Sequence, residues 1–249
     1  MKQYWEVKAK ANKTGELLLY GEIVSSDLWG DGVTPTQIDA ALKALGEIDT
    51  LNVYVNSAGG SVFAGMAIFN IIKRHTATTK NAYVDGLAAS IASVIVMACD
   101  KVIMPSNAMM VIHNPMGLVA GNAGEMRKMA DALDKVRETI LAVYREKTGK
   151  TDEELIPLLD AETWLTAEEA IALGFADEMQ AEVKIAASLD GGFLVFGGVK
   201  VDTATFRNFR SETIETYREA PIPPEPVIDT LQTQVKEFSR LKSKILGGQ

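Results

Sequence analysis

Hydrophobic and polar positions in the middle of the chain follow two different periods. Residues 51–56 (Leu-Asn-Val-Tyr-Val-Asn) alternate between apolar and more polar side chains, which predicts a strand that ends at the turn-forming Ser57-Ala58-Gly59-Gly60. Across residues 61–74, apolar side chains recur every three to four positions, which predicts an amphipathic helix. The chain therefore contains a strand-turn-helix unit.

A second unit of the same kind follows. Residues 78–84 are rich in β-forming side chains, Gly86-Leu87-Ala88-Ala89 is expected to turn, and residues 90–98 are small or apolar on every side. Because a helix without a polar face has to be buried, this helix is predicted to lie in the core. Two short strands are expected next, at residues 101–104 and 109–113.

The following part of the chain predicts a glycine-containing loop over residues 116–124 and a long helix over residues 126–147. Thr151 and Thr166 each precede a glutamate by three residues, so capping boxes should start two further helices. Strands that alternate with helices over most of the chain predict an α/β domain with crossover connections. We expect this domain to occupy residues 1–185.

The remainder of the chain has a different character. Residues 186–220 form a β-prone extension with a predicted strand at Phe193-Leu194-Val195-Phe196. Residues 221–226 (Pro-Ile-Pro-Pro-Glu-Pro) hold four of the eight prolines and predict an extended linker. Residues 227–249 predict a terminal helix whose apolar stripe packs either on its own domain or on a partner.

Charge argues against a nucleic-acid partner. The formal net charge is −8, and residues 186–249 hold 8 basic and 8 acidic side chains, so the first 185 residues carry all of it. A chain without a basic surplus cannot replace the counterions of a phosphate backbone.

The scarcity of certain residues narrows the functional classes further. One cysteine and two histidines are too few for a four-ligand zinc site of these residues. The longest uncharged stretch of the apolar middle, residues 86–99, is too short to span a bilayer, and Met1–Glu6 lacks the features of a secretory signal. We therefore expect a cytoplasmic protein with no membrane partner.

Ser90 is the first candidate for chemistry. It lies where a strand gives way to a buried helix, and free amides at a helix start favour a developing negative charge. The competing interpretation is that Ser90 only caps the helix, which serine does commonly. Gly59 and Gly60 have the same ambiguity, because paired glycines can direct N–H groups to an oxyanion or merely form a tight turn.

A serine nucleophile needs a base and an acid that orients the base. His113 ends an apolar strand before Asn114-Pro115, whereas His75 is expected at a solvated helix end, so His113 is the predicted base. Asp160 and Glu162 lie between two predicted helices and are both candidates for the acid. Each could equally be an ordinary loop residue.

Five blocks of the sequence form an ordered set: Asn56-Ser57-Ala58-Gly59-Gly60-Ser61-Val62, Gly86-Leu87-Ala88-Ala89-Ser90, Ile112-His113-Asn114-Pro115, Lys147-Thr148-Gly149-Lys150, and Thr163–Ala170 with Gly174-Phe175-Ala176-Asp177. Taken in order, they closely resemble the ClpP-type serine peptidases, over about residues 15–180. Within that family the sequence most resembles the ClpP-related head maturation (prohead) proteases of tailed phages and prophages, which carry a C-terminal extension.

The resemblance implies a ClpP/crotonase-like spiral of ββα units with Ser90 as nucleophile and His113 as general base. It implies Asp160 as the preferred acid, with Glu162 as the alternative, because the spacing before Trp164 differs from that of housekeeping ClpP. The oxyanion hole would use the amides of three residues: Gly60, Ile91 and, as a further candidate, Gly59. A second departure is Ala58, which stands where the family usually has proline.

The implied function is a serine endopeptidase that processes phage capsid or scaffold proteins during head maturation. The resemblance also implies a homo-oligomeric ring and no metal or organic cofactor. Three alternatives remain open: a housekeeping proteolytic subunit that works with an ATPase unfoldase, a non-catalytic capsid scaffold, and a crotonase-class acyl-CoA enzyme. If the chain is phage-encoded, it would act in the host cytoplasm or in the prohead.

Overall fold

The computed structural model describes residues 5–10, 12–26 and 32–181, together with three strands between residues 187 and 202. These residues all fall within the first of two compact units, residues 1–217. The predicted linker at 221–226 and the predicted helix at 227–249 lie outside the described residues.

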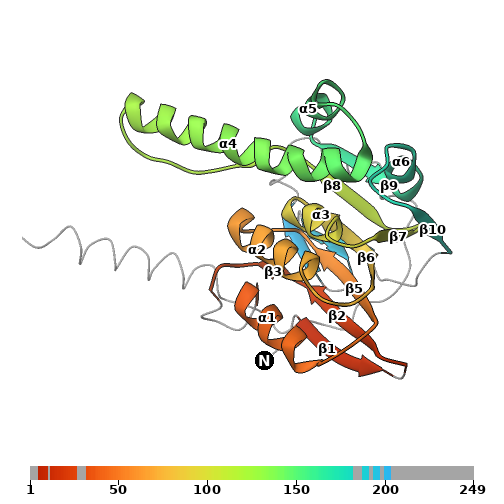
Figure 1. Cartoon of the computed structure of the whole chain (residues 1–249). Helices are drawn as coiled ribbons and strands as arrows, with labels where there is room; N and C mark the ends of the chain where they lie inside the picture. Colours follow the sequence, from red (N-terminus) through yellow and green to blue (C-terminus); the bar gives the residue numbers. More distant parts are fainter. Residues whose placement is uncertain are drawn as a thin grey trace, which may run out of the picture. The chain divides into compact units, whose positions relative to one another are not determined.

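An eight-stranded sheet forms the centre of this unit (Figure 1). Its main path runs β1-β2-β5-β6-β7-β10, and all of these neighbours are parallel except the β1–β2 hairpin. β8 joins the last residues of β6 and pairs in turn with β9. The strands of the sheet are β1 (Trp5–Lys10), β2 (Thr14–Tyr20), β5 (Thr50–Ser57), β6 (Thr79–Ala89), β7 (Lys101–Pro105), β8 (Met109–Ile112), β9 (Thr163–Thr166) and β10 (Glu178–Gln180).

The other described strands form two smaller sheets. β3 (Glu22–Ile23) and β4 (Gly32–Val33) pair in parallel. β11 (Ala187–Asp190), β12 (Phe193–Phe196) and β13 (Val199–Asp202) form an antiparallel sheet. The strand expected at residues 193–196 is therefore present.

Among the described residues, six helices alternate with these strands, and their ends follow local sequence signals. Thr34 and Thr166 each form a complete capping box with the side chain three residues on, and the long helix stops where Gly149 adopts a φ of +70°. The helices are α1 (Pro35–Ala44), α2 (Val62–Lys73), α3 (Ile91–Val96), α4 (Ala123–Thr148), α5 (Asp152–Asp160) and α6 (Ala167–Ala172).

The prediction of a turn at Gly86–Ala89 is wrong, because β6 continues as a strand to Ala89. Leu87–Ala89 pair with β8, and this long-range pairing overrides the local preference of the glycine. The helix expected at residues 90–98 is shorter than predicted, but all of its six residues are buried, as its apolar character requires. The sequence patterns had indicated none of β1 to β4, α1, β9 or β10.

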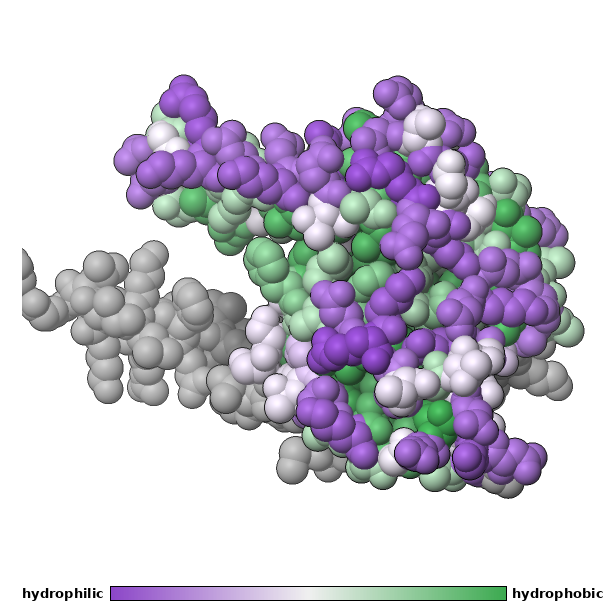
Figure 2. Space-filling view, viewed as in Figure 1, coloured by the Kyte–Doolittle hydropathy of each residue, from purple (hydrophilic) through white to green (hydrophobic). Residues whose placement is uncertain are grey.

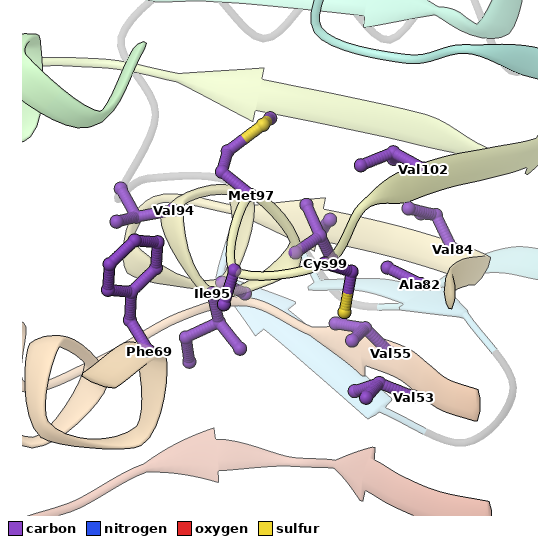
Figure 3. Packing of buried hydrophobic residues seen from close by; sticks show 14 of the residues in the cluster. Val53, Val55, Phe69, Ala82, Val84, Val94, Ile95, Met97, Cys99 and Val102 are labelled. Atoms are coloured by element: carbon purple, nitrogen blue, oxygen red, sulfur yellow. The ribbon is translucent and has the colours of Figure 1, made fainter. Parts of the chain in front are cut away.

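The core is formed by the sheet and by buried side chains of all six helices, with α2 and α3 prominent among them. Figure 3 shows Val94 and Ile95 of α3 beside Phe69 of α2, and it shows Cys99 next to Val55 of β5. The thiol of Cys99 is buried, and burial raises its pKa to about 12, so it remains protonated at neutral pH. Cys99 therefore serves as a small core residue.

Helix α4 extends well beyond the sheet at its N-terminal end (Figure 1). Figure 2 shows hydrophilic side chains along its upper side and hydrophobic ones beneath. Within the described part of the chain, no helix has the length and apolar character needed to cross a membrane.

Candidate active site

Ser90 occupies a strained turn between β6 and α3. Its φ of +56° and ψ of −129° lie outside the regions that residues with a side chain normally adopt. Its side chain makes no capping bond to the helix, so the interpretation of Ser90 as a simple N-cap is wrong. A strained strand-to-helix turn is the geometry that presents a serine hydroxyl to a substrate.

Positive φ angles at residues other than glycine mark the same site. Four such residues occur among the described residues, and Asn12 and Lys13 belong to the turn of the β1–β2 hairpin. The other two are Ser90 and Glu162, at φ +56° and +51°. Strained residues persist where the surrounding structure holds them, and they cluster at active sites. The positive φ angles of Ser90 and Glu162 therefore indicate that both residues belong to a functional site.

Strand pairing brings Ser90, His113 and Glu162 to one region. The Ser90 amide donates to the carbonyl of Val111 at 2.9 Å, two residues before His113. On the other side of β8, the antiparallel register pairs Ile112 with Thr163. Continuing that register by one step places His113 opposite Glu162.

The imidazole of His113 is buried, and burial lowers its pKa below the ordinary value of 6.5. The nearby carboxylate of Glu162, itself buried, acts in the opposite direction and raises this pKa. The net direction is downward, so His113 is neutral at pH 7 and can accept a proton.

Asp160, the acid that the family resemblance favours, is bonded to the neighbour of His113 and to an arginine. It ends α5, its side chain is 56% exposed, and its carboxylate accepts a hydrogen bond from Asn114 at 2.7 Å and faces Arg137 at 3.9 Å. The charge that acts on His113 is that of Glu162. The β-forming character of Thr163-Trp164-Leu165-Thr166 was the signal that could have favoured Glu162, because it predicts the strand that pairs with β8.

The glycine turn lies directly against Ser90. A Cβ on Gly59 would meet the Cβ of Ser90 at 2.7 Å and the amide nitrogen of Ile91 at 3.2 Å. Ser57 holds this turn, because its hydroxyl accepts from the Gly59 amide at 3.1 Å and donates to the carbonyl of Gly21 at 2.5 Å. The loss of proline at position 58 therefore leaves the turn well anchored.

The three expected oxyanion donors differ in availability. The Gly59 amide is occupied by Ser57. The bridge between Ile23 and Gly60 uses the carbonyl of Gly59 and the amide of Ser61, which leaves the Gly60 N–H outside that ladder. Ile91 is the first residue of α3, so its N–H has no partner within the helix. Gly60 and Ile91 are thus better placed than Gly59 to stabilise an oxyanion.

Other residues of interest lie around this centre. His75 lies just after the end of α2, the position expected for it, and its Nδ1 accepts a hydrogen bond from the amide of Ala77. Ser93 and Tyr144 form a buried hydrogen-bonded pair that touches the Ser90 backbone, and the sequence patterns had not indicated either. The two residues are 51 positions apart, so no local pattern could have joined them.

Taken together, the region places a strained serine, a buried neutral histidine, a carboxylate and two amides at adjacent strand and helix ends. These are the groups that nucleophilic acyl transfer requires. Comparison with known proteins agrees with this chemistry, because residues 12–183 match the family model described as Clp protease.

Curated relatives agree with the family model. An ATP-dependent Clp protease proteolytic subunit of Streptococcus gordonii is 37% identical over 147 residues, which cover 56% of this chain and 73% of the relative. A protein of the same name from Bacteroides fragilis is 30% identical over 155 residues, which cover 60% of this chain and 74% of the relative.

Among solved structures, a point mutant of ClpP1 from Listeria monocytogenes is similar, with a TM-score of 0.58 and 27% identity. The similarity covers 69% of this chain and 92% of that chain, so the expected ClpP-like α/β fold is confirmed. Because the family model spans more than half of the sequence, the chain belongs to the Clp protease family.

Proposed function

We propose that this chain is a serine endopeptidase in which Ser90 is the nucleophile, His113 the general base and Glu162 the acid that orients the imidazole. The observation that supports this most strongly is the strained turn at Ser90, because the Ser90 amide is bonded to strand β8, which ends one residue before His113. The register of β8 with β9 supports Glu162 as the third member.

In the first half-reaction, the Ser90 hydroxyl oxygen attacks the carbonyl carbon of a peptide bond while His113 accepts the hydroxyl proton. The amides of Gly60 and Ile91 donate to the oxyanion that forms. Collapse of this intermediate breaks the C–N bond, and His113 returns the proton to the leaving amine. Water then attacks the acyl-enzyme by the same steps in reverse, so only amino-acid side chains, backbone and water take part.

A fluorophosphonate probe tests the assignment directly. We expect the probe to label the wild-type chain at Ser90, as located by mass spectrometry of the digested protein, and to leave Ser90→Ala unlabelled. A folded wild-type chain without label at Ser90 would reject the proposal in favour of the non-catalytic scaffold or the crotonase-class enzyme.

We further propose that copies of the chain associate through the outer part of α4, as the family resemblance to ring-forming peptidases suggests. Leu118 is 97% exposed, Met126 is 51% exposed, and Met129 and Leu133 are only partly covered. The preceding loop runs along the helix, since a Cβ on Gly117 would lie 3.2 Å from the sulfur of Met129. An apolar strip of this kind on a projecting element fits contact with a second copy.

For the biological role, we propose processing of capsid or scaffold proteins during phage head maturation. The supporting observation is that the sequence continues from residue 184 to 249 beyond the family match. The names of the curated relatives favour the alternative, a proteolytic subunit that works with an ATPase. Incubation with a coat or scaffold protein, with and without an unfoldase ATPase and ATP, separates the two: ATP-independent cleavage at defined sites supports head maturation.

We propose the cytoplasm as the compartment in which this chain acts. The one cysteine is free and buried, so the described structure contains no disulfide, which fits a reducing compartment such as the cytoplasm.

A further inference from the structure

Helix α4 reaches the Ser90 backbone through a chain of two buried hydroxyl groups. The Tyr144 hydroxyl lies 2.7 Å from the Ser93 hydroxyl, and the Ser93 hydroxyl donates to the carbonyl oxygen of Ser90 at 2.5 Å. Tyr144 and Ser93 are both almost fully buried, and they belong to α4 and α3, which lie against each other (Figure 1). No step of the peptidase reaction described above uses these side chains.

The direction of the hydrogen bonds follows from counting protons. A serine hydroxyl has a single proton, and that of Ser93 is given to the Ser90 carbonyl. The Tyr144 hydroxyl must therefore donate to the Ser93 oxygen. Burial raises the pKa of Tyr144 above its ordinary value of 10, so this proton is retained throughout the neutral range.

The bonded carbonyl belongs to the same peptide unit as one of the proposed oxyanion donors. The C=O of Ser90 and the N–H of Ile91 share one planar unit, and no peptide bond in the described residues is cis. In a trans peptide these two groups point in opposite directions. A bond that fixes the Ser90 carbonyl therefore also fixes the direction of the Ile91 N–H, away from Ser93.

The peptide plane that follows Ser90 depends on hydrogen bonds to the Ser90 carbonyl. Ser90 has a strained backbone, so its peptide plane needs external contacts to hold its angle. The Ser93 amide contributes one bond to the Ser90 carbonyl at 3.0 Å, and the Ser93 hydroxyl adds the second. Both acceptor sites of that carbonyl are then occupied.

We infer that Tyr144 and Ser93 are positioning residues that hold the Ile91 amide in the orientation needed to stabilise the oxyanion. The inference rests on the proposed peptidase function. It assigns no contact with substrate to either side chain, and it gives the C-terminal part of α4 a role in the rate of the chemical step.

Tyr144→Phe and Ser93→Ala test this inference in the full-length chain. A misaligned oxyanion donor weakens the transition state more than the bound substrate. We expect kcat for a fluorogenic short peptide to fall about tenfold with KM changed by less than about twofold. The double variant should lose no more than the larger single loss, because the two hydroxyls act as one chain.

Inhibition by a peptide boronic acid, which forms a tetrahedral adduct on serine, separates positioning from simple loss of folded protein. Loss of folded enzyme lowers the apparent kcat but leaves the inhibition constant unchanged. Misalignment should weaken inhibition by about the same factor as it lowers kcat/KM. Tyr144→Phe keeps the ring that packs edge-on against Phe175, and Ser93→Ala serves if the tyrosine variant does not fold.

Val143→Ala is the matched control. Val143 is buried on the same helix, so its truncation lowers stability by leaving a cavity while the hydroxyl chain stays intact. We expect an unchanged inhibition constant for this variant. Wild-type kcat and inhibition in both Tyr144→Phe and Ser93→Ala would overturn the inference, whereas failure of the wild type to be labelled at Ser90 would overturn the peptidase proposal instead.

Discussion

The two ends of helix α4 meet different surroundings. Toward the C-terminus, Ile140, Leu141 and Tyr144 are buried, and Tyr144 bonds to the helix that starts at the candidate nucleophile. From residue 123 to residue 135, only Met129 and Leu133 are even partly covered. One continuous helix thus has an inner end in the core and an outer end that is largely exposed, with the preceding loop beside Met129.

This difference separates catalysis from association. Burial at the inner end stabilises the fold and can transmit small changes to the Ser90 turn. The outer end keeps its helical form through the Asn122 capping box and continuity with the inner end, while its apolar side chains remain exposed. Loss of the Tyr144 hydroxyl at the inner end should therefore alter chemistry, and changes at the outer end should alter assembly.

The largest expected effect comes from removing the reacting groups. Ser90→Ala and His113→Ala should each lower peptide hydrolysis by more than about 10³-fold, because members of a catalytic triad act as a unit. His75→Ala is the histidine control and should retain activity close to that of the wild type. Assembly size by sedimentation should not change, and retention of a tenth of the activity in either variant would contradict the assignment.

The next effect distinguishes the two acids. Glu162→Gln should lower kcat by about 10³-fold or more, since an amide cannot hold the imidazole in the required tautomer. Asp160→Asn should cost less than about tenfold, because an asparagine can still accept the hydrogen bond from Asn114. Steady-state kinetics measure both losses. A larger loss of kcat in Asp160→Asn than in Glu162→Gln would identify Asp160 as the acid instead.

Gly59→Ala should be the third most damaging change. Its Cβ would clash with Ser90 and with the carbonyl of Ala89, in addition to the cost of its φ of +93°. Gly46→Ala is the matched control, because Gly46 has a φ of +67° but no atom within 4 Å of the added Cβ. We expect Gly46→Ala to lower the free energy of unfolding, measured by thermal unfolding, by only about 1 kcal/mol and to keep wild-type activity. Gly59→Ala should lose activity.

At the outer end of α4, replacing Met129 and Leu133 together by serine should reduce the mass of the assembly in native mass spectrometry. The labelling rate of Ser90 should stay within about threefold of the wild type, because these side chains lie far along the helix from Tyr144. Unchanged assembly would show that copies associate through another surface.

The smallest effect concerns pH. Only the neutral imidazole acts as a base, and the pKa of His113 is lowered below 6.5, so the acid limb of kcat/KM should lie below pH 6.5. Glu162→Gln removes the carboxylate that raises this pKa, so the residual activity should have an acid limb at still lower pH. The buried neutral His113 stabilises the fold above about pH 6.5, and this contribution is lost as pH falls. A limb above 6.5 in the wild type would contradict the assigned surroundings of His113.

Local patterns in the sequence determined much of this protein. The period of apolar residues predicted β5, α2 and α4, and an unbroken run of small and apolar residues predicted α3. The glycine turn at 57–60 was recognisable, and Ser90 and His113 both lay at predicted element ends. These features depend on neighbours within one or two turns of chain, where period and turn chemistry act directly. The ordered blocks then sufficed to indicate the family.

Only the tertiary structure decided which distant groups meet. Pairing of β8 with β9 favoured Glu162 over Asp160, and pairing of β6 with β8 turned the expected turn at Gly86–Ala89 into strand. The contact of Tyr144 with Ser93 spans 51 residues. Strand register and buried polar contacts depend on partners far away in the chain, so no local pattern of hydrophobic and polar positions contains them.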